Sequence, residues 1–263
     1  MKKILWIALT ALWVSTAATP ALALGPLGAE AGLPLYSKYI WRGMNQTNDY
    51  VLQPYLDLSV LGFTAGVWGN WNLTDEDALQ GEFSEVDYKL AYSLGLPFTE
   101  LGAGFLWYDY PKHERDNTAE FYLSAKANVL LAPSLILYND IDKFKGAYWL
   151  ATIGHGIKVG ESTQVDLSGG IGLGSENYIK GYFPVDSDLP WSPDYSIGAS
   201  LTDYFIDARV PFHPIPFLTI APSVTWTSLL GDAKDSINAA PDGQYYDGKT
   251  DNFFWGLSAT FSF

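Results

Sequence analysis

The sequence predicts an all-β protein: a transmembrane, antiparallel, up-and-down β-barrel of about 12 strands, with short periplasmic turns and long extracellular loops. Three observations carry this prediction. Apolar and polar residues alternate with period two along nearly the whole chain. Short connections between these segments alternate with long ones. The last segment is an aromatic strand that ends at Phe263.

The alternation is clear in segment 83–95, where apolar residues occupy the even positions from Val86 to Leu94 and mostly polar residues the odd ones. Segments of about 9–11 residues have the length that a tilted strand needs to cross a bilayer. The predicted strands are 33–43, 51–61, 63–72, 83–95, 100–110, 117–129, 134–141, 146–158, 163–175, 194–210, 217–228 and 252–263.

Turns of a few residues, such as Leu61-Gly62, alternate with longer polar loops, of which 176–193 and 229–251 are the longest. An even strand number places both termini on the periplasmic side. A soluble sandwich or lipocalin-like barrel is the alternative, but it would not need aromatic residues at the strand ends. The residues expected to form an outer aromatic girdle are Tyr39, Trp41, Trp68, Trp71, Trp107, Tyr108, Tyr110, Tyr148 and Trp149.

The terminal strand favours the membrane barrel. Its apolar residues alternate up to Phe261 and the chain stops at Phe263, which resembles the sorting signal of bacterial outer-membrane barrels. In a soluble protein, an exposed terminal strand this aromatic would be an aggregation hazard. We therefore expect the protein in the cell outer membrane of a Gram-negative bacterium, in contact with outer-membrane lipid and lipopolysaccharide. The barrel-assembly machinery would read Phe261 and Phe263.

Residues 1–23 have the three parts of a secretory signal peptide. Two lysines precede an apolar run, and Ala21-Leu22-Ala23 is a small-residue cleavage site. An uncleaved membrane anchor is the alternative, but the apolar run is too short to span a bilayer comfortably. We expect residues 1–23 to be removed and residues 24–263 to form one barrel domain.

The composition agrees with a folded, acidic protein. The 263 residues are 48% apolar and 16% aromatic, and the charged fraction of 17% is too low for a disordered chain. With a net charge of −14, no nucleic acid is expected as a partner, because binding to phosphates needs basic patches. The absence of Cys excludes disulfides and a Cys nucleophile.

The segment from Ser37 to Gln46, SKYIWRGMNQ, follows the pattern S-x-Y-x-x-R-G-x-x-Q. It resembles an early strand of the TorF-type family of proteobacterial outer-membrane porins, whose functions are largely unassigned. Residues 51–54 and 62–70 look like the next hairpin of the same group. The resemblance covers residues 36–72 and the terminal strand. It implies an outer-membrane porin and carries no substrate or catalytic residue to transfer.

Charged residues of both signs fall on the polar face of the predicted strands, which is the face of the lumen. A barrel of twelve strands is compatible with a narrow channel and also with a lumen that ion pairs close. We favour the channel. The alternation in 194–210 shifts from odd to even positions, which predicts a β-bulge near Thr202-Asp203. The predicted pore-lining residues are Lys38, Arg42, Asp57, Glu85, Asp87, Lys89, Glu120, Lys126, Asp140, Asp166, Asp207 and Arg209.

No catalytic, cofactor or metal site is predicted. His113 lies in a charged loop and His213 in a turn, and His155 has no Ser, Asp or Glu within three residues. Some outer-membrane phospholipases also have twelve strands, so an enzyme with a Ser from a neighbouring strand is a less favoured alternative. The acidic loop run Asp75-Glu76-Asp77 lacks the spacing of an EF-hand.

The leading functional expectation is a channel for the passive diffusion of small polar solutes or ions. Loops 73–82, 176–194 and 229–251 hold 13 acidic residues and 3 lysines, so their rim should attract cations. The preference should be moderate, because basic side chains oppose the acids inside the lumen. A non-conducting structural or surface-interaction barrel is the alternative.

Overall fold

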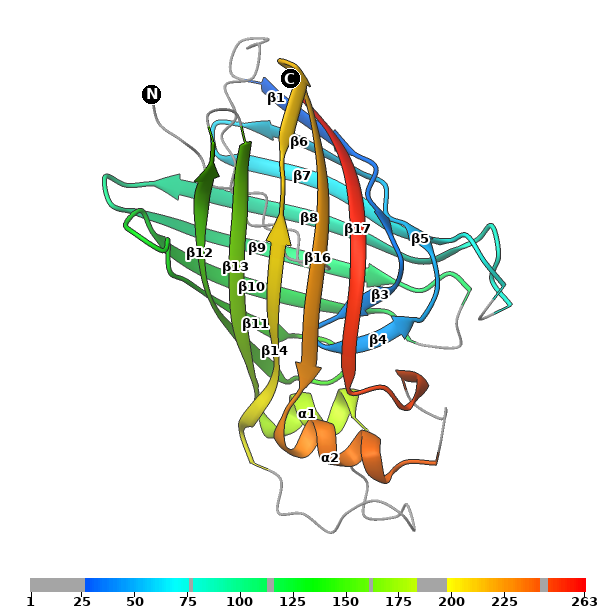
Figure 1. The fold of residues 1–263 in the computed structure, drawn as a ribbon. Helices are drawn as coiled ribbons and strands as arrows, with labels where there is room; N and C mark the ends of the chain where they lie inside the picture. The colour runs from blue at the N-terminus through cyan, green and yellow to red at the C-terminus, as the bar shows by residue number, and fades with distance from the viewer. Residues whose placement is uncertain (1–26, 76–77, 113–115, 161–162, 184–197, 242–245) are drawn as a thin grey trace.

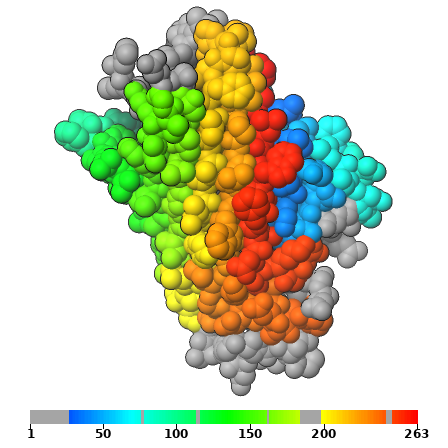
Figure 2. Space-filling model, in the orientation of Figure 1, coloured from blue at the N-terminus to red at the C-terminus, as the bar shows by residue number. Residues whose placement is uncertain are grey.

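Twelve antiparallel strands close into a barrel in the computed structural model, which describes residues 27–75, 78–112, 116–160, 163–183, 198–241 and 246–263 (Figure 1). The last strand, β17 (Asp251–Ser262), pairs with β1 (Leu27–Gly32) on one side and with β16 (Leu218–Leu229) on the other. The red C-terminal strand accordingly lies between orange β16 and the blue N-terminal strand in Figure 2. This closure pairs the backbone groups that an open sheet edge would leave free.

Three wall strands are interrupted. The first wall strand consists of β1 and β2 (Leu35–Tyr36), the second of β5 (Val51–Leu52) and β6 (Tyr55–Val60), and the tenth of β14 (Ser200–Arg209) and β15 (Phe212–Ile215). The remaining wall strands are β7 (Phe63–Asn72), β8 (Phe83–Gly95), β9 (Thr99–Asp109), β10 (Thr118–Ala127), β11 (Ser134–Asp140), β12 (Ala147–Val159) and β13 (Thr163–Gly174).

Side chains alternate between the two faces of the wall. Phe63, Leu90 and Phe253 point outward and are 61%, 63% and 66% exposed, whereas Asp57 and Glu120 point inward and are buried. An apolar outer face around a polar interior is the reverse of a soluble barrel and matches a membrane barrel. The soluble alternative therefore does not fit this fold.

The predicted strands 63–72 and 83–95 coincide with β7 and β8, and most others agree within two residues. Part of the predicted strand 194–210 lies outside the described residues. The bulge predicted near Thr202-Asp203 is confirmed. The register between β13 and β14 shifts there, so that Gly172 lies opposite Asp203 and Leu173 opposite Leu201.

The predicted first strand, 33–43, is wrong. The wall strand ends at Tyr36, and the chain then forms a separate two-stranded hairpin of β3 (Tyr39–Trp41) and β4 (Met44–Thr47). Its two turn residues, Arg42 and Gly43, have φ of +48° and +79°, the pattern of a type I′ turn. Period two cannot separate a wall strand from such a hairpin, because both alternate.

Two helices, α1 (Glu176–Tyr182) and α2 (Gly231–Ala239), and the short helix η1 (Tyr246–Gly248) lie at one end of the barrel (Figure 1). We call it the loop end, and the opposite end, where β1 begins, the turn end. The Ser175 hydroxyl caps α1 by accepting a hydrogen bond from the Tyr178 backbone N–H. None of the helices in the described ranges is long and apolar enough to cross a membrane.

Most of the expected outer girdle is not on the outer face. Trp71 and Trp107 are 36% and 38% exposed, as a girdle requires. The predicted girdle residues that are instead buried are Tyr39, Trp41, Trp68, Tyr108, Tyr110 and Tyr148. Several of them pack around the β3–β4 hairpin and α1, so they belong to an internal aromatic cluster.

We predict that Gly43→Ala destabilises the barrel more than Gly81→Ala. Both glycines have nearly the same φ, +79° and +78°, so both changes cost about 1–2 kcal/mol of backbone strain. A Cβ at Gly43 would also lie 2.8 Å from Cβ of Asp203 and from Cδ2 of Leu229, whereas one at Gly81 meets nothing within 4 Å. This crowding should add about 1–3 kcal/mol. Urea unfolding in lipid vesicles measures the difference, and equal losses would contradict the close packing of the hairpin tip.

Candidate functional site

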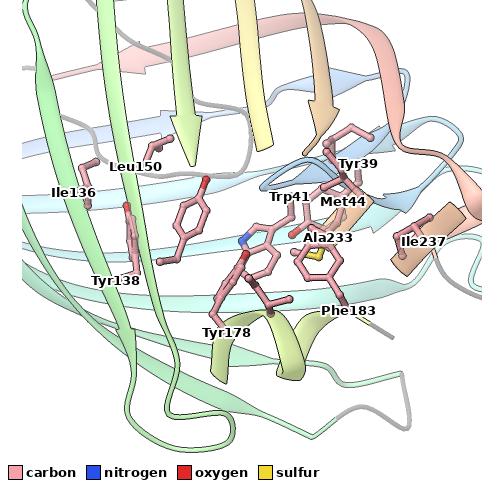
Figure 3. Packing of buried hydrophobic residues seen from close by; sticks show 14 of the residues in the cluster. Tyr39, Trp41, Met44, Ile136, Tyr138, Leu150, Tyr178, Phe183, Ala233 and Ile237 are labelled. Carbon is pink, nitrogen blue, oxygen red and sulfur yellow. The ribbon is translucent and has the colours of Figure 1, made fainter. Parts of the chain in front are cut away.

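The β3–β4 hairpin and α1 fill the loop end of the lumen (Figure 3). We call residues 37–50 the plug, and α1 packs against it, with the ring centroids of Trp41 and Tyr182 5.0 Å apart. The hairpin contacts inward-facing side chains far apart around the wall: the Tyr39 hydroxyl donates to Glu85 on β8 at 2.8 Å, and Lys38 Nζ donates to Asn252 on β17 at 3.2 Å. A segment with such contacts lies inside the barrel.

The tip of the hairpin carries a buried ion pair. Arg42 Nη1 and Nη2 donate to the two carboxylate oxygens of Glu120 on β10, at 2.9 and 2.6 Å. The Tyr108 hydroxyl donates to the same carboxylate at 2.7 Å. Both side chains of the pair are 1% exposed. This bidentate geometry is among the strongest forms of carboxylate–guanidinium contact.

Four aromatic rings surround the Arg42 guanidinium. Its Cζ atom lies 4.3 Å from the ring centroid of Trp41, 4.5 Å from Tyr148, 4.6 Å from Tyr138 and 5.7 Å from Tyr178. All four distances are within the range of a cation–π interaction. The guanidinium therefore sits in an aromatic box that one carboxylate closes.

The electrostatics of this box favour the charged form of Arg42. Burial by itself would lower the pKa of Arg42, but the Glu120 carboxylate raises that pKa well above its ordinary value. Burial raises the pKa of the Tyr178 phenol, so this wall of the box stays neutral. The box thus holds one cation against one anion.

A second buried ion pair lies on the wall itself. Lys89 Nζ on β8 is 2.8 Å from Asp57 Oδ2 on β6, and their side chains are 4% and 5% exposed. Glu30 lies opposite Asp57 in the register of β1 and β6, and its carboxylate accepts from the Tyr55 hydroxyl at 3.0 Å. The predicted residues Asp57 and Lys89 are therefore direct partners.

Further charged residues form a third group along β13 and β14. The register places Asp166 opposite Arg209, and Asp207 accepts from the Thr225 hydroxyl at 2.7 Å. On another part of the wall, Lys126 of β10 lies opposite Glu100 of β9 in the register of these strands. The inner surface thus carries both signs of charge along its whole length.

The remaining predicted residues divide into two kinds. Glu85 and Asp87 face inward near the plug, and Asp87 interacts electrostatically with both Glu85 and Glu120. Asp140 instead holds a loop in place, because it accepts from the Thr118 hydroxyl at 2.6 Å and from three backbone N–H groups of residues 142–145. Asp140 is a structural residue of the loop end.

Four residues of this site were not predicted from the sequence: Glu30, Glu100, Tyr138 and Tyr178. Glu30 precedes the predicted first strand, although it alternates with Ala29 and Ala31 as a wall residue does. Glu100 opens a predicted strand on the inward phase, so the alternation could have identified it. Tyr178 lies on a helix within a predicted loop, where the only local signal was the cap at Ser175.

The two histidines within the described residues lie in different environments. His155 is exposed on the outer face opposite Leu167, and His213 hydrogen-bonds with Thr219 at 2.9 Å. His113 lies outside the described residues. Within the described part of the chain, no group of three or more His, Cys, Asp or Glu residues is placed to hold a metal ion.

The residues of the predicted sorting signal lie at the turn end. Phe261 is 38% exposed on the outer face, and the Phe263 ring stacks on Phe217 with the centroids 5.9 Å apart. The Phe263 backbone N–H also donates to the carbonyl of Ala29 at 2.8 Å. Their role in sorting stays a prediction, as does the signal peptide, which lies outside the described residues.

Residues 20–208 match the model of a bacterial protein family of unknown function, Gcw_chp. The chain belongs to this family. The match includes the plug hairpin and both buried ion pairs, whereas the TorF-type resemblance is not confirmed. Among curated proteins, no sequence is significantly similar to this chain.

Solved structures with a similar fold are outer-membrane proteins. A NanC porin superposes with a TM-score of 0.50 at 10% identity, over 89% of this chain and 98% of that chain. The OmpF protein of Salmonella typhi, solved with daunomycin, and Omp33 of Acinetobacter baumannii each give a TM-score of 0.38 at 8% identity. Each of these two matches covers 90% of this chain, together with 97% of the OmpF chain and 98% of the Omp33 chain. The likeness to the NanC porin confirms the barrel fold.

We predict that Glu120→Ala destabilises the barrel by about 3–5 kcal/mol, because it leaves the Arg42 guanidinium buried without a carboxylate. The control is Glu176→Ala, which removes an exposed pair with Lys180 whose side chains are 52% and 50% exposed. That change should cost less than about 0.5 kcal/mol. Urea unfolding of the refolded barrel compares the two, and a small loss for Glu120→Ala would contradict a tight buried pair.

Proposed function

We propose that the protein is an outer-membrane channel through which small polar solutes or ions diffuse passively. One observation carries the proposal: a lumen with opposed charges inside an apolar wall. Acidic and basic side chains face each other at Arg42–Glu120 and Lys89–Asp57. Charged walls of this kind order polar solutes in a narrow pore. The fold shared with the NanC porin supports the same role by analogy.

The outer face and the terminal strand of the barrel support a location in the outer membrane. An apolar outer wall needs lipid around it, and a closed barrel is the form in which β-structure crosses a bilayer. The aromatic C-terminal strand supports delivery by the barrel-assembly machinery of a Gram-negative bacterium. The acidic long loops support contact with divalent cations at the lipopolysaccharide surface.

The plug determines when such a channel conducts. With the Arg42 and Glu120 side chains 1% exposed, solvent does not reach this ion pair, and we infer that the plug closes the lumen at this level. A solute can pass only when the hairpin withdraws, so the described conformation is the closed one. Because β3 and β4 form a separate sheet and pair with each other, not with the wall strands, the hairpin can move without opening the wall ladder.

A second function is favoured by the same plug. A lumen filled at its loop end by residues such as Met44, Tyr178 and Ile179 suits a non-conducting barrel that presents its loops to a partner. The two functions differ in one measurable property, which is ionic current through the barrel.

We predict that removing the hairpin opens the barrel. Residues 38–47 replaced by a Gly-Ser linker of equal length should increase the mean current in a planar bilayer at least about tenfold over wild type, because ion flux grows steeply as a pore widens. The control replaces residues 78–81 in the loop between β7 and β8, of which Ala78, Gln80 and Gly81 are exposed, and should leave the current unchanged. A hairpin-free, folded barrel without current would contradict the channel and favour the non-conducting barrel.

We also predict moderate cation selectivity that depends on the inward acids. The triple variant Glu85→Gln, Asp87→Asn and Glu120→Gln, made in the hairpin-free barrel, should shift the reversal potential in a salt gradient toward anions. The control neutralises three exposed rim acids, Asp75, Asp235 and Asp247, to Asn.

The rim control should have a smaller effect that disappears at high salt, because screening limits exposed charges to about 8 Å at physiological ionic strength. Selectivity for anions in the parent, or an unchanged triple variant, would show that the inward acids do not control permeation.

A further inference from the structure

The Arg42 guanidinium is bound at the inner face of the barrel wall in the way that a ligand is bound in a site. Apart from Trp41, the groups that surround it belong to the wall and to α1, not to the hairpin that carries it. Asp203, which accepts from the Tyr148 hydroxyl at 3.1 Å, lies next to the hairpin tip and interacts electrostatically with Arg42. The groups of this wall site are Glu120, Tyr108, Tyr138, Tyr148, Tyr178 and Asp203.

We propose that this wall site binds a solute that carries a guanidinium group, such as arginine, and that Arg42 occupies the site as an internal ligand while the plug is closed. The inference rests on the proposed function, because the solute reaches the site through the lumen. It adds the chemical class of solute that the channel recognises.

The charge balance of the loop end supports a cationic solute. The described inward side chains near the hairpin tip include four acids: Glu85, Asp87, Glu120 and Asp203. The plug brings Arg42 against Glu120, whereas the described contact of Lys38 is with the Asn252 amide oxygen. When Arg42 withdraws, Glu120 loses its partner, and a desolvated carboxylate without a cation is strongly unfavourable. A cationic solute that replaces Arg42 restores this balance.

The geometry selects guanidinium over ammonium. Glu120 presents both carboxylate oxygens to two parallel N–H donors, which a planar guanidinium provides and an ammonium group does not. The rings of Tyr138 and Tyr148 lie 4.6 and 4.5 Å from the guanidinium carbon, where a flat cation can stack on them. The wall site therefore has the shape and the charge for this group.

The tether of Arg42 sets how strongly a free solute must compete. A group held on a short segment acts at an effective concentration of order millimolar. Free arginine should therefore bind the wild type weakly. It should bind more tightly when the side chain at position 42 is a poorer occupant of the wall site.

The test measures the binding of arginine to the refolded full barrel in detergent, as a saturable rise in Tm. The apparent affinity should increase from wild type to Arg42→Lys to Arg42→Ala, with at least about a tenfold difference between the first and the last. Guanidinium, at concentrations far below denaturing, should act like arginine on Arg42→Ala. Citrulline and urea, the neutral analogues of the two probes, should have no effect.

The matched control is the double variant Arg42→Ala, Glu120→Gln, in which arginine should bind at least about tenfold more weakly than in Arg42→Ala. If Arg42→Ala does not fold, the comparison of wild type with Arg42→Lys carries the test. Equal responses to arginine and citrulline, or binding that is independent of Glu120, would overturn the wall site.

Binding in detergent needs no current, so the two proposals can fail separately. Saturable arginine binding in a barrel that never conducts would support the wall site and overturn the channel. Current through the hairpin-free barrel, together with no saturable binding of arginine to the Arg42→Ala barrel, would overturn the wall site and leave the channel.

Discussion

The pairing of β17 with both β1 and β16 is the constraint on which the rest of the structure depends. Once the wall closes, strand alternation sends every second side chain into an enclosed space. Polar groups in that space lose water and must find partners within the protein. Asp57 with Lys89 and Glu120 with Arg42 are two solutions to this requirement.

The two ion pairs differ in the segment that carries the basic side chain. Lys89 is a wall residue on a strand near Asp57, so closure of the wall is enough to form that pair. Arg42 lies on a segment that leaves the wall after Tyr36 and returns at Val51, and it reaches Glu120 from inside the lumen. The wall makes room for the aromatic neighbours of this segment. A Cβ at Gly172 would collide with the Tyr148 hydroxyl and with Asp203.

The period-two alternation of the sequence therefore predicted the wall strands well and the plug poorly. Strands β7 and β8 follow directly from period-two alternation, and the bulge at Thr202 follows from its one-residue shift. The hairpin has the same alternation but faces no lipid, so its aromatic residues were assigned to the outer girdle. The partnership of Arg42 and Glu120 joins residues 78 positions apart and has no local signal. Only the closed barrel brings them together.

The position of Arg42 links closure of the lumen to its charge. In the closed conformation Arg42 neutralises Glu120, so the loop end presents less negative charge to a solute than its acids suggest. If the hairpin withdraws as proposed, Glu120 is uncovered and a positive charge leaves the same place, so the opened lumen would become more negative as it becomes wider. Widening weakens the field of the distant rim through screening, whereas acids on the wall stay close to the permeating ion. Cation preference in the open state should therefore depend more on Glu85, Asp87 and Glu120 than on the exposed loops.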